Sequence, residues 1–203
     1  MAGSEASNAK NPTLQKPGAG LPWWELLVAR HLVFPMACRK PWATAAQQFQ
    51  DEGARVLAVL DSIPAERVSE PVLVPRIAGM EDSSRFWSAI MTVEHLNMVG
   101  SAVRRVISSL RQGQVPSVEP RVADFKPRGS ITPAEVRSEF VRLLADAAEA
   151  EKVEPPIPRG VGPRYGHPWF GPMDAHQWHC LLGFHQGVHR KQIEAIRKGL
   201  GIA

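Results

Sequence analysis

Cysteine and long apolar runs, which mark many secreted and membrane proteins, are both scarce in this sequence. Only two cysteines occur among 203 residues, Cys38 and Cys180, far apart and outside any Cys-x-x-Cys pattern. Two cysteines cannot form a disulfide framework, so we expect a reduced, cytoplasmic protein. No run of about 18 apolar residues is present, and no apolar segment follows Lys10 and Lys16. The sequence therefore predicts neither a membrane-spanning helix nor a secretory signal peptide.

An excess of one charge is also lacking. Lys and Arg number 24 against 20 Asp and Glu, and the basic residues between 104 and 128 are interrupted by acids and turns. A nucleic-acid-binding domain usually gathers its basic residues on one stripe. We therefore expect no nucleic-acid partner and no membrane partner. With 44% hydrophobic and 22% charged residues, the chain has the composition of an ordinary globular protein.

The chain divides into a polar start and a longer apolar-patterned part. Residues 1–20 are small and polar, which predicts a disordered tail, followed by a single domain over residues 21–203. Residues 22–40 are largely apolar and open on a proline, which predicts an extra N-terminal helical segment that covers the rest of the fold. We expect Trp23 and Trp24 to be packing groups there, since tryptophan is commonly buried.

Four longer amphipathic patterns follow, separated by proline-rich links. The first covers 44–61, and the second begins after a polar N-cap cluster at 82–84 and continues to about residue 110. The third opens at Thr132 and the fourth at Asp174, each with a Glu or Gln three residues later, which is the signature of a capping box. Only 72–77 resembles an extended piece. The patterns predict an all-α four-helix bundle with long connections.

Three histidines fall on the helix faces that point into this bundle. An α-helix turns about 100° per residue, which places His185 and His189 about 40° apart on one apolar stripe. His95 has apolar neighbours at helical spacing in the second pattern. By the same rotation His176 and His179 fall on the outer side of the last helix, and we expect them at the surface.

Burying three imidazoles together requires partners for their nitrogens. One divalent metal ion binds three nitrogens at once, and three histidines with open positions are typical of catalytic sites. Zinc, nickel and iron all accept imidazole ligands. His95, His185 and His189 are therefore the candidate metal ligands. The alternative is that each is a hydrogen-bonded residue of the core.

Other reaction chemistries lack their motifs. His185 and His189 have the spacing of a zinc-protease His-Glu-x-x-His motif, but Gln186 replaces the glutamate that acts as general base. No Glu-x-x-His pair suits a di-iron bundle, and no phosphate-binding glycine loop or nucleophile elbow is present. Cys180 is turned away from the histidine stripe and is expected to pack in the core.

Two stretches that carry these histidines resemble the DinB-like (DinB/YfiT-like) metalloprotein superfamily. They are SAIMTVEHL, which contains His95, and HPWFGPMDAHQWHCLLGFHQGVHRKQI, which contains His185 and His189. The resemblance covers roughly residues 43–198. It implies an up-down-down-up four-helix bundle, often a homodimer, that holds a divalent metal ion on these three histidines. Residues 22–40 depart from the family's pattern.

The resemblance implies a thiol-dependent transferase or isomerase that uses a low-molecular-weight thiol and acts on a small molecule. A metal ion that activates a bound water would also allow a metal-dependent hydrolase. His167 is a candidate for proton transfer or, alternatively, a turn residue before Pro168. Glu94 is a candidate hydrogen-bond partner of a ligand or, alternatively, a residue at the helix flank. The non-enzymatic alternative is a metal-stabilised helical bundle that acts in a stress response or as an interaction module.

Overall fold

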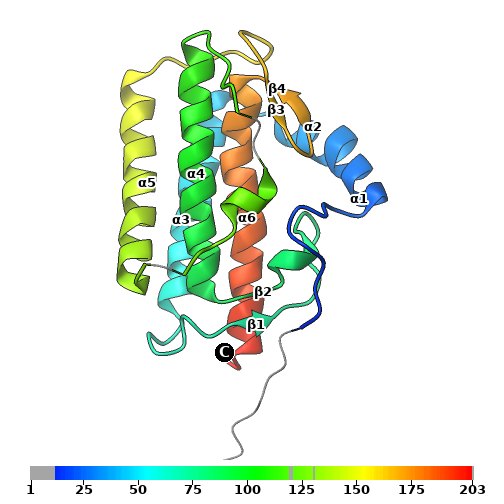
Figure 1. The fold of residues 1–203 in the computed structure, drawn as a ribbon. Coiled ribbons are helices and arrows are strands. Elements are labelled where there is room, and N and C mark those ends of the chain that lie inside the picture. Colours follow the sequence, from blue (N-terminus) through cyan, green and yellow to red (C-terminus); the bar gives the residue numbers. More distant parts are fainter. Residues whose placement is uncertain (1–11, 119–120, 130, 203) are drawn as a thin grey trace, which may run out of the picture.

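Four long helices form the body of the molecule, and a short helical segment lies to one side (Figure 1). The computed structural model describes residues 12–118, 121–129 and 131–202. Its long helices are α3 (Trp42–Asp61), α4 (Ala89–Arg111), α5 (Pro133–Val153) and α6 (Ala175–Gly199). The short helices are α1 (Trp23–Val28), the π-helix η1 (Ala29–Val33), α2 (Phe34–Ala37), and the 3-10 helices η2 (Asp82–Ser84) and η3 (Val122–Phe125).

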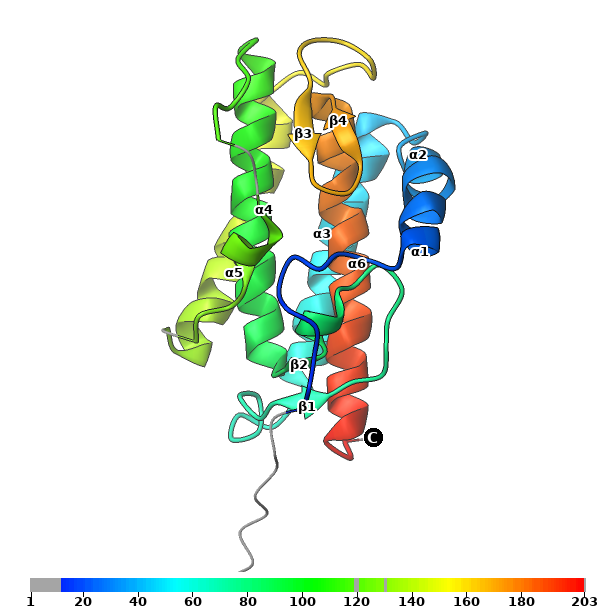
Figure 2. The same cartoon turned by 45° about the vertical axis from the view of Figure 1, so that its right-hand side comes forward.

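Strand structure is limited, within the described ranges, to two short antiparallel pairs. Strand β1 (Val72–Leu73) pairs with β2 (Phe86–Trp87), and β3 (Tyr165–His167) pairs with β4 (Gly171–Met173). The mostly helical structure agrees with the predicted all-α class. The β3–β4 hairpin leads directly into α6 and was not expected from the sequence (Figure 2).

The contacts between the long helices show how they run. Helices α3 and α6 are parallel, because Trp42 at the start of α3 stacks on His179 near the start of α6, and Arg197 near the end of α6 bonds Ser62 just beyond α3. Helix α4 is antiparallel to α6, because Trp87 just before α4 stacks on His189, whereas His95 within α4 meets His185 one turn earlier in α6. Helix α5 is parallel to α4. Asn97 donates a hydrogen bond to the Val136 carbonyl, and farther along both helices Arg104 donates to the Asp146 carbonyl. Consecutive helices α4 and α5 therefore need a link that returns along the length of the bundle, not a tight turn.

Local signals at the helix starts decide where most of these helices begin. The capping boxes at Thr132 and Asp174 are both formed, which confirms the predicted starts of α5 and α6. The predicted N-cap cluster at 82–84 is wrong. Those residues form η2 and lead into β2, and the cap of α4 is Ser88, whose side chain accepts a hydrogen bond from the Met91 N–H.

Helices α3 and α6 approach each other closely at Gly183. A Cβ atom at this position would lie 3.0 Å from the backbone nitrogen of Phe49, a contact that real Cβ atoms rarely make. The absence of a side chain therefore lets the two helices pack tightly. This contact fixes the part of α6 that leads into the candidate metal ligands.

The N-terminal segment is helical, as predicted, but most of its apolar surface faces outward. Phe34 is buried and stacks on Phe170 with ring centroids 4.2 Å apart, and the buried Glu25 pairs with Arg76. The prediction that Trp23 and Trp24 are packing groups is wrong, because they are 74% and 53% exposed. The segment is anchored through a few residues, so its other side lies away from the helices.

Part of the predicted tail can be placed. The backbone N–H groups of Gly18 and Gly20 donate to the buried carboxylate of Glu81, and that of Gln15 donates to Asp82. Residues 1–11 lie outside the described residues. Across the described ranges, no helix has both the length and the apolar character that a membrane span requires.

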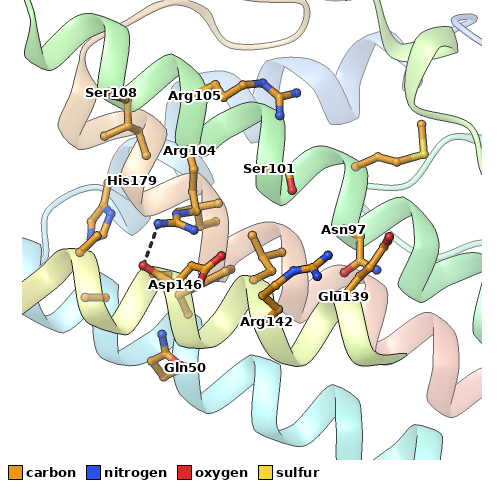
Figure 3. Close-up of a pocket in the computed structure, with 18 of the residues that line it drawn as sticks. Gln50, Asn97, Ser101, Arg104, Arg105, Ser108, Glu139, Arg142, Asp146 and His179 are labelled. Atoms are coloured by element: carbon orange, nitrogen blue, oxygen red, sulfur yellow. Dashed lines mark hydrogen bonds between the residues drawn. The ribbon is translucent and has the colours of Figure 1, made fainter. Parts of the chain in front are cut away.

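A polar hollow of about 870 Å³ lies beside α4 and α5 (Figure 3). Ser101 and Arg104 line it from α4, and Asp146 lines it from α5. Its lining carries charges of both signs, and the Arg104 guanidinium donates to the Asp146 carbonyl at 2.8 Å. None of the three candidate ligands borders this hollow.

Candidate metal centre

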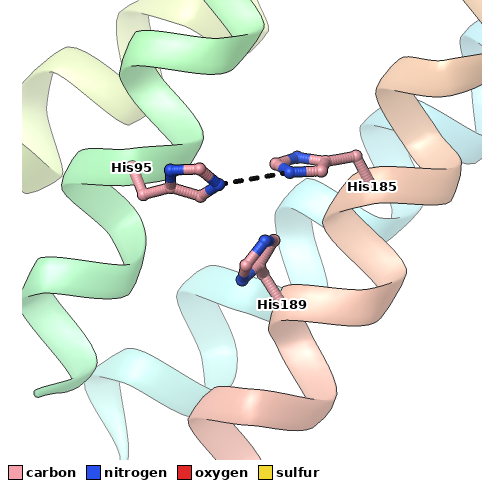
Figure 4. Close-up of side chains that lie close together, drawn as sticks. All are labelled: His95, His185 and His189. Carbon is pink, nitrogen blue, oxygen red and sulfur yellow. Dashed lines mark hydrogen bonds between the residues drawn. The ribbon is translucent and has the colours of Figure 1, made fainter. Parts of the chain in front are cut away.

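The three predicted ligands meet between α4 and α6 (Figure 4). One ligand nitrogen from each of His95, His185 and His189 lies within 4.8 Å of the other two. His185 and His189 are one turn apart on α6, and His95 faces them from α4. The three histidines therefore lie close enough to hold one metal ion.

Hydrogen bonds outside the cluster orient two of the imidazoles. The Nδ1–H of His95 donates to the Phe125 carbonyl at 2.6 Å, and the Nδ1–H of His189 donates to the Gln192 side-chain oxygen at 2.7 Å. The Gln192 amide in turn donates to the Ser84 carbonyl at 2.7 Å, which fixes its orientation. Both Nε2 atoms are therefore left as acceptors. Metal-binding histidines are typically held in this way.

The spacing of two of the nitrogens suits a tetrahedral ion. The Nε2 atoms of His95 and His185 are 3.2 Å apart. Two nitrogens at usual zinc distances of about 2.0–2.1 Å and a tetrahedral angle are about 3.3 Å apart. The donor set and the spacing of this pair thus fit a first-row divalent ion.

Burial keeps the three imidazoles neutral. Desolvation lowers the pKa of His189 to about 4, and it lowers the pKa of His95 and His185 well below the usual value of 6.5. Neighbouring imidazoles lower the pKa values of His95 and His185 further. Near pH 7 each ring therefore offers an unprotonated nitrogen, which metal binding requires.

Glu94 acts on the site through a loop. Its buried carboxylate accepts hydrogen bonds from the backbone N–H groups of Arg128 and Gly129, at 2.9 and 3.0 Å. This loop also contains Phe125, whose carbonyl accepts from His95. Glu94 therefore helps to position that carbonyl without contacting a ligand ring. Phe125 could not be found from the sequence, because a backbone carbonyl carries no side-chain identity.

The prediction that His176 and His179 lie at the surface is wrong. Both are buried, at 5% and 4% exposure. His176 forms a hydrogen bond with the Lys40 carbonyl, and His179 forms one with the Trp42 carbonyl. The rings of His179 and Trp42 are stacked, with centroids 3.8 Å apart. Helix α3 covers the side of α6 opposite to the candidate metal ligands, so α6 is enclosed on more than one face.

His179 makes the folded state sensitive to acid. Burial lowers its pKa to about 4, despite the Glu151 carboxylate oxygen 3.9 Å from its Nε2 atom. Between pH 6.5 and about 4 the unfolded chain binds a proton that the native chain does not. The free energy of unfolding should therefore fall as pH falls through this range, by about 3 kcal/mol from this group.

This pH effect can be measured by urea unfolding of chelator-treated protein between pH 7.5 and 4.5. We expect His179→Asn to be less stable than the unmodified protein at pH 7.5 but to lose less stability in acid. The exposed His31 provides the matched control, and His31→Asn should keep the original pH dependence. Equal slopes for His179→Asn and the unmodified protein would contradict the assignment.

The two cysteines contact each other although they are far apart in the sequence. Cys38 and Cys180 are buried free thiols. A hydrogen bond with Cys180, together with burial, raises the pKa of the Cys38 thiol above its usual range. Cys38 is therefore held as a thiol, and neither cysteine borders the three-histidine cluster.

A second cavity, of about 440 Å³, is lined in part by all three histidines. Its walls include Val99 and Val106 of α4 and Leu181 of α6. His167 also lines it, from the end of β3. The three-histidine site, this cavity and the β3–β4 hairpin are thus continuous.

Comparisons of the chain with protein-family models, with curated proteins and with solved structures find no match.

Proposed function

We propose that this protein is a metal-dependent enzyme of the DinB-like type, in which His95, His185 and His189 hold one zinc, nickel or iron ion. The observation that carries the proposal is the convergence of three neutral imidazoles, two of them fixed by outer hydrogen bonds, in the lining of a cavity. Three protein ligands leave room for a further one, as catalytic sites do. The resemblance of the histidine-bearing stretches supports the same assignment.

The reaction class follows from what such a site does. A bound divalent ion lowers the pKa of a coordinated water or thiol and so supplies a nucleophile near neutral pH. The chain contributes neutral ligands, a carbonyl and an amide that orient them, and apolar walls that limit the access of water. We therefore propose thiol-dependent transfer or isomerisation, or hydrolysis, of a small molecule.

The arrangement of the long helices supports the fold part of the proposal. Helices α3 and α6 share one direction, and α4 and α5 share the opposite one. In chain order this corresponds to an up-down-down-up bundle, the arrangement that the resemblance implies. The ligands then come from the second and the last long helix.

The alternative is an ion that only stabilises the bundle. A chain of this size buries enough surface to fold without a metal staple, and the outward-facing α1 side chains offer a separate interaction surface. A staple would have a closed coordination shell. The enzyme hypothesis requires an open one.

Cobalt(II) substitution tests this difference. We expect the visible absorption bands of the cobalt-loaded protein to change when 2-mercaptoethanol is added, because the thiolate enters an open position. Chelation should lower the melting temperature only modestly. No spectral change, together with a large loss of thermal stability on chelation, would support the staple instead. His95→Ala, treated in the same way, is the control for cobalt bound elsewhere.

A further inference from the structure

The cavity that the three histidines line also has walls that suit an apolar ligand. They include six side chains that come mainly from α4 and α6: Val99, Ala102, Val106, Val122, Trp178 and Leu181. A cavity of about 440 Å³ lies within the usual range for small-molecule sites. Such walls offer few hydrogen bonds to a sugar or a peptide. The shape and the chemistry therefore favour a compact apolar molecule.

The charged groups of this cavity are mostly paired within the protein. Lys126 donates to Glu81 and to two serines, and Arg121 pairs with Asp124. Arg105, which also lines the cavity, is exposed and makes no ion pair within the described ranges. An ionised group deep among the apolar walls would thus lack a partner, and burying it would be costly. The cavity therefore favours a ligand that is uncharged in its buried part.

His167 supplies a hydrogen-bond donor at the cavity wall. Its Nδ1 atom accepts from the backbone N–H groups of Trp169 and Phe170, at 3.1 and 3.4 Å. Burial lowers its pKa to about 4, so the ring is neutral near pH 7. A neutral imidazole that accepts at Nδ1 carries its hydrogen on Nε2. No acceptor for this Nε2–H occurs among the residues that the structure describes.

We propose that the substrate of this site is an uncharged, largely apolar small molecule whose carbonyl or similar oxygen accepts a hydrogen bond from His167 Nε2–H. Both sequence-based interpretations of His167 then have a part: Nδ1 holds the hairpin turn, and Nε2 binds the ligand. The inference deepens the proposed function by naming its substrate class. The apolar walls and the donor do not depend on a bound metal.

A series of alkyl phenyl ketones tests the walls. Acetophenone, butyrophenone and hexanophenone are titrated into chelator-treated and zinc-loaded protein, and binding is followed by calorimetry. We expect affinity to rise about fourfold per added methylene until the cavity is filled. We expect hexanophenone to bind about two- to tenfold more tightly than hexylbenzene, which lacks the acceptor oxygen.

Three variants locate the binding. His167→Asn retains a side-chain oxygen that can accept from the following backbone N–H groups, and it should lose the preference for the ketone while keeping the dependence on chain length. Ala102→Trp should fill the cavity and abolish binding. Its neighbour Ser101 lines the polar hollow instead, so Ser101→Trp should bind as the unmodified protein does.

The outcomes separate this inference from the proposed function. Chain-length-dependent binding to the chelator-treated protein supports the apolar site even if no metal is taken up. The absence of such dependence in both forms overturns the inference, whatever the metal content. Tighter binding of 5-phenylpentanoate than of hexanophenone overturns the uncharged class. Because the chain-length series uses the unmodified protein, an unfolded variant does not leave the proposal undecided.

Discussion

His95→Ala and His189→Ala are each expected to reduce bound metal from about one ion per chain to a small fraction. Each substitution leaves two imidazoles, fewer than the three protein ligands that catalytic sites use. Loss of a residue that merely orients a ligand weakens metal binding by roughly 10–100-fold. Loss of a ligand should therefore weaken it by more than roughly a hundredfold. Mass spectrometry of the metal content after equilibrium dialysis measures the effect.

The control for this experiment is His31→Ala, which removes an exposed histidine and should retain the ion. Circular dichroism should show the helices intact in all three variants, because the long helices have an apolar core of their own. Retention of the ion by both ligand variants would place it elsewhere. An unmodified protein that takes up no zinc, nickel or iron would leave the three histidines as core residues.

Phe140→Ala is expected to lower the free energy of unfolding by about 3–5 kcal/mol, because a large buried ring is replaced by a cavity. Phe140 is fully buried in α5. Its neighbour Val141 is 41% exposed on the same helix, and Val141→Ala should change stability by no more than about 0.5 kcal/mol. Urea unfolding of the two variants measures the difference. Equal, small effects would show that α5 contributes little to the core.

The parts that the sequence predicted correctly are governed by local rules. The capping boxes at Thr132 and Asp174 depend on residues three positions apart. The grouping of the candidate metal ligands followed from the helical rotation of about 100° per residue. His185 and His189 share a face by spacing alone, and His95 could be matched to them because it also pointed inward.

The parts that it did not predict depend on contacts between distant segments. The rotation that put His179 outside assumed one apolar face, but α3 packs on the other face. Trp23 lies outward because its segment attaches to the body elsewhere. The acceptor for His95 is a backbone carbonyl at Phe125, and no residue type encodes it. Periodicity describes a helix by itself, whereas each of these features requires the neighbour to be known.

The distribution of the ligands over the helices has a consequence for local motion. Helices α4 and α6 carry all three histidines, and α5 carries none. Proteins open in cooperative segments of different stability, which amide hydrogen exchange detects. An ion at this site would join α4 to α6 and slow exchange in both. Helix α5 could still fray or detach without releasing a ligand, so its amides would exchange at nearly the same rate in the presence and absence of metal.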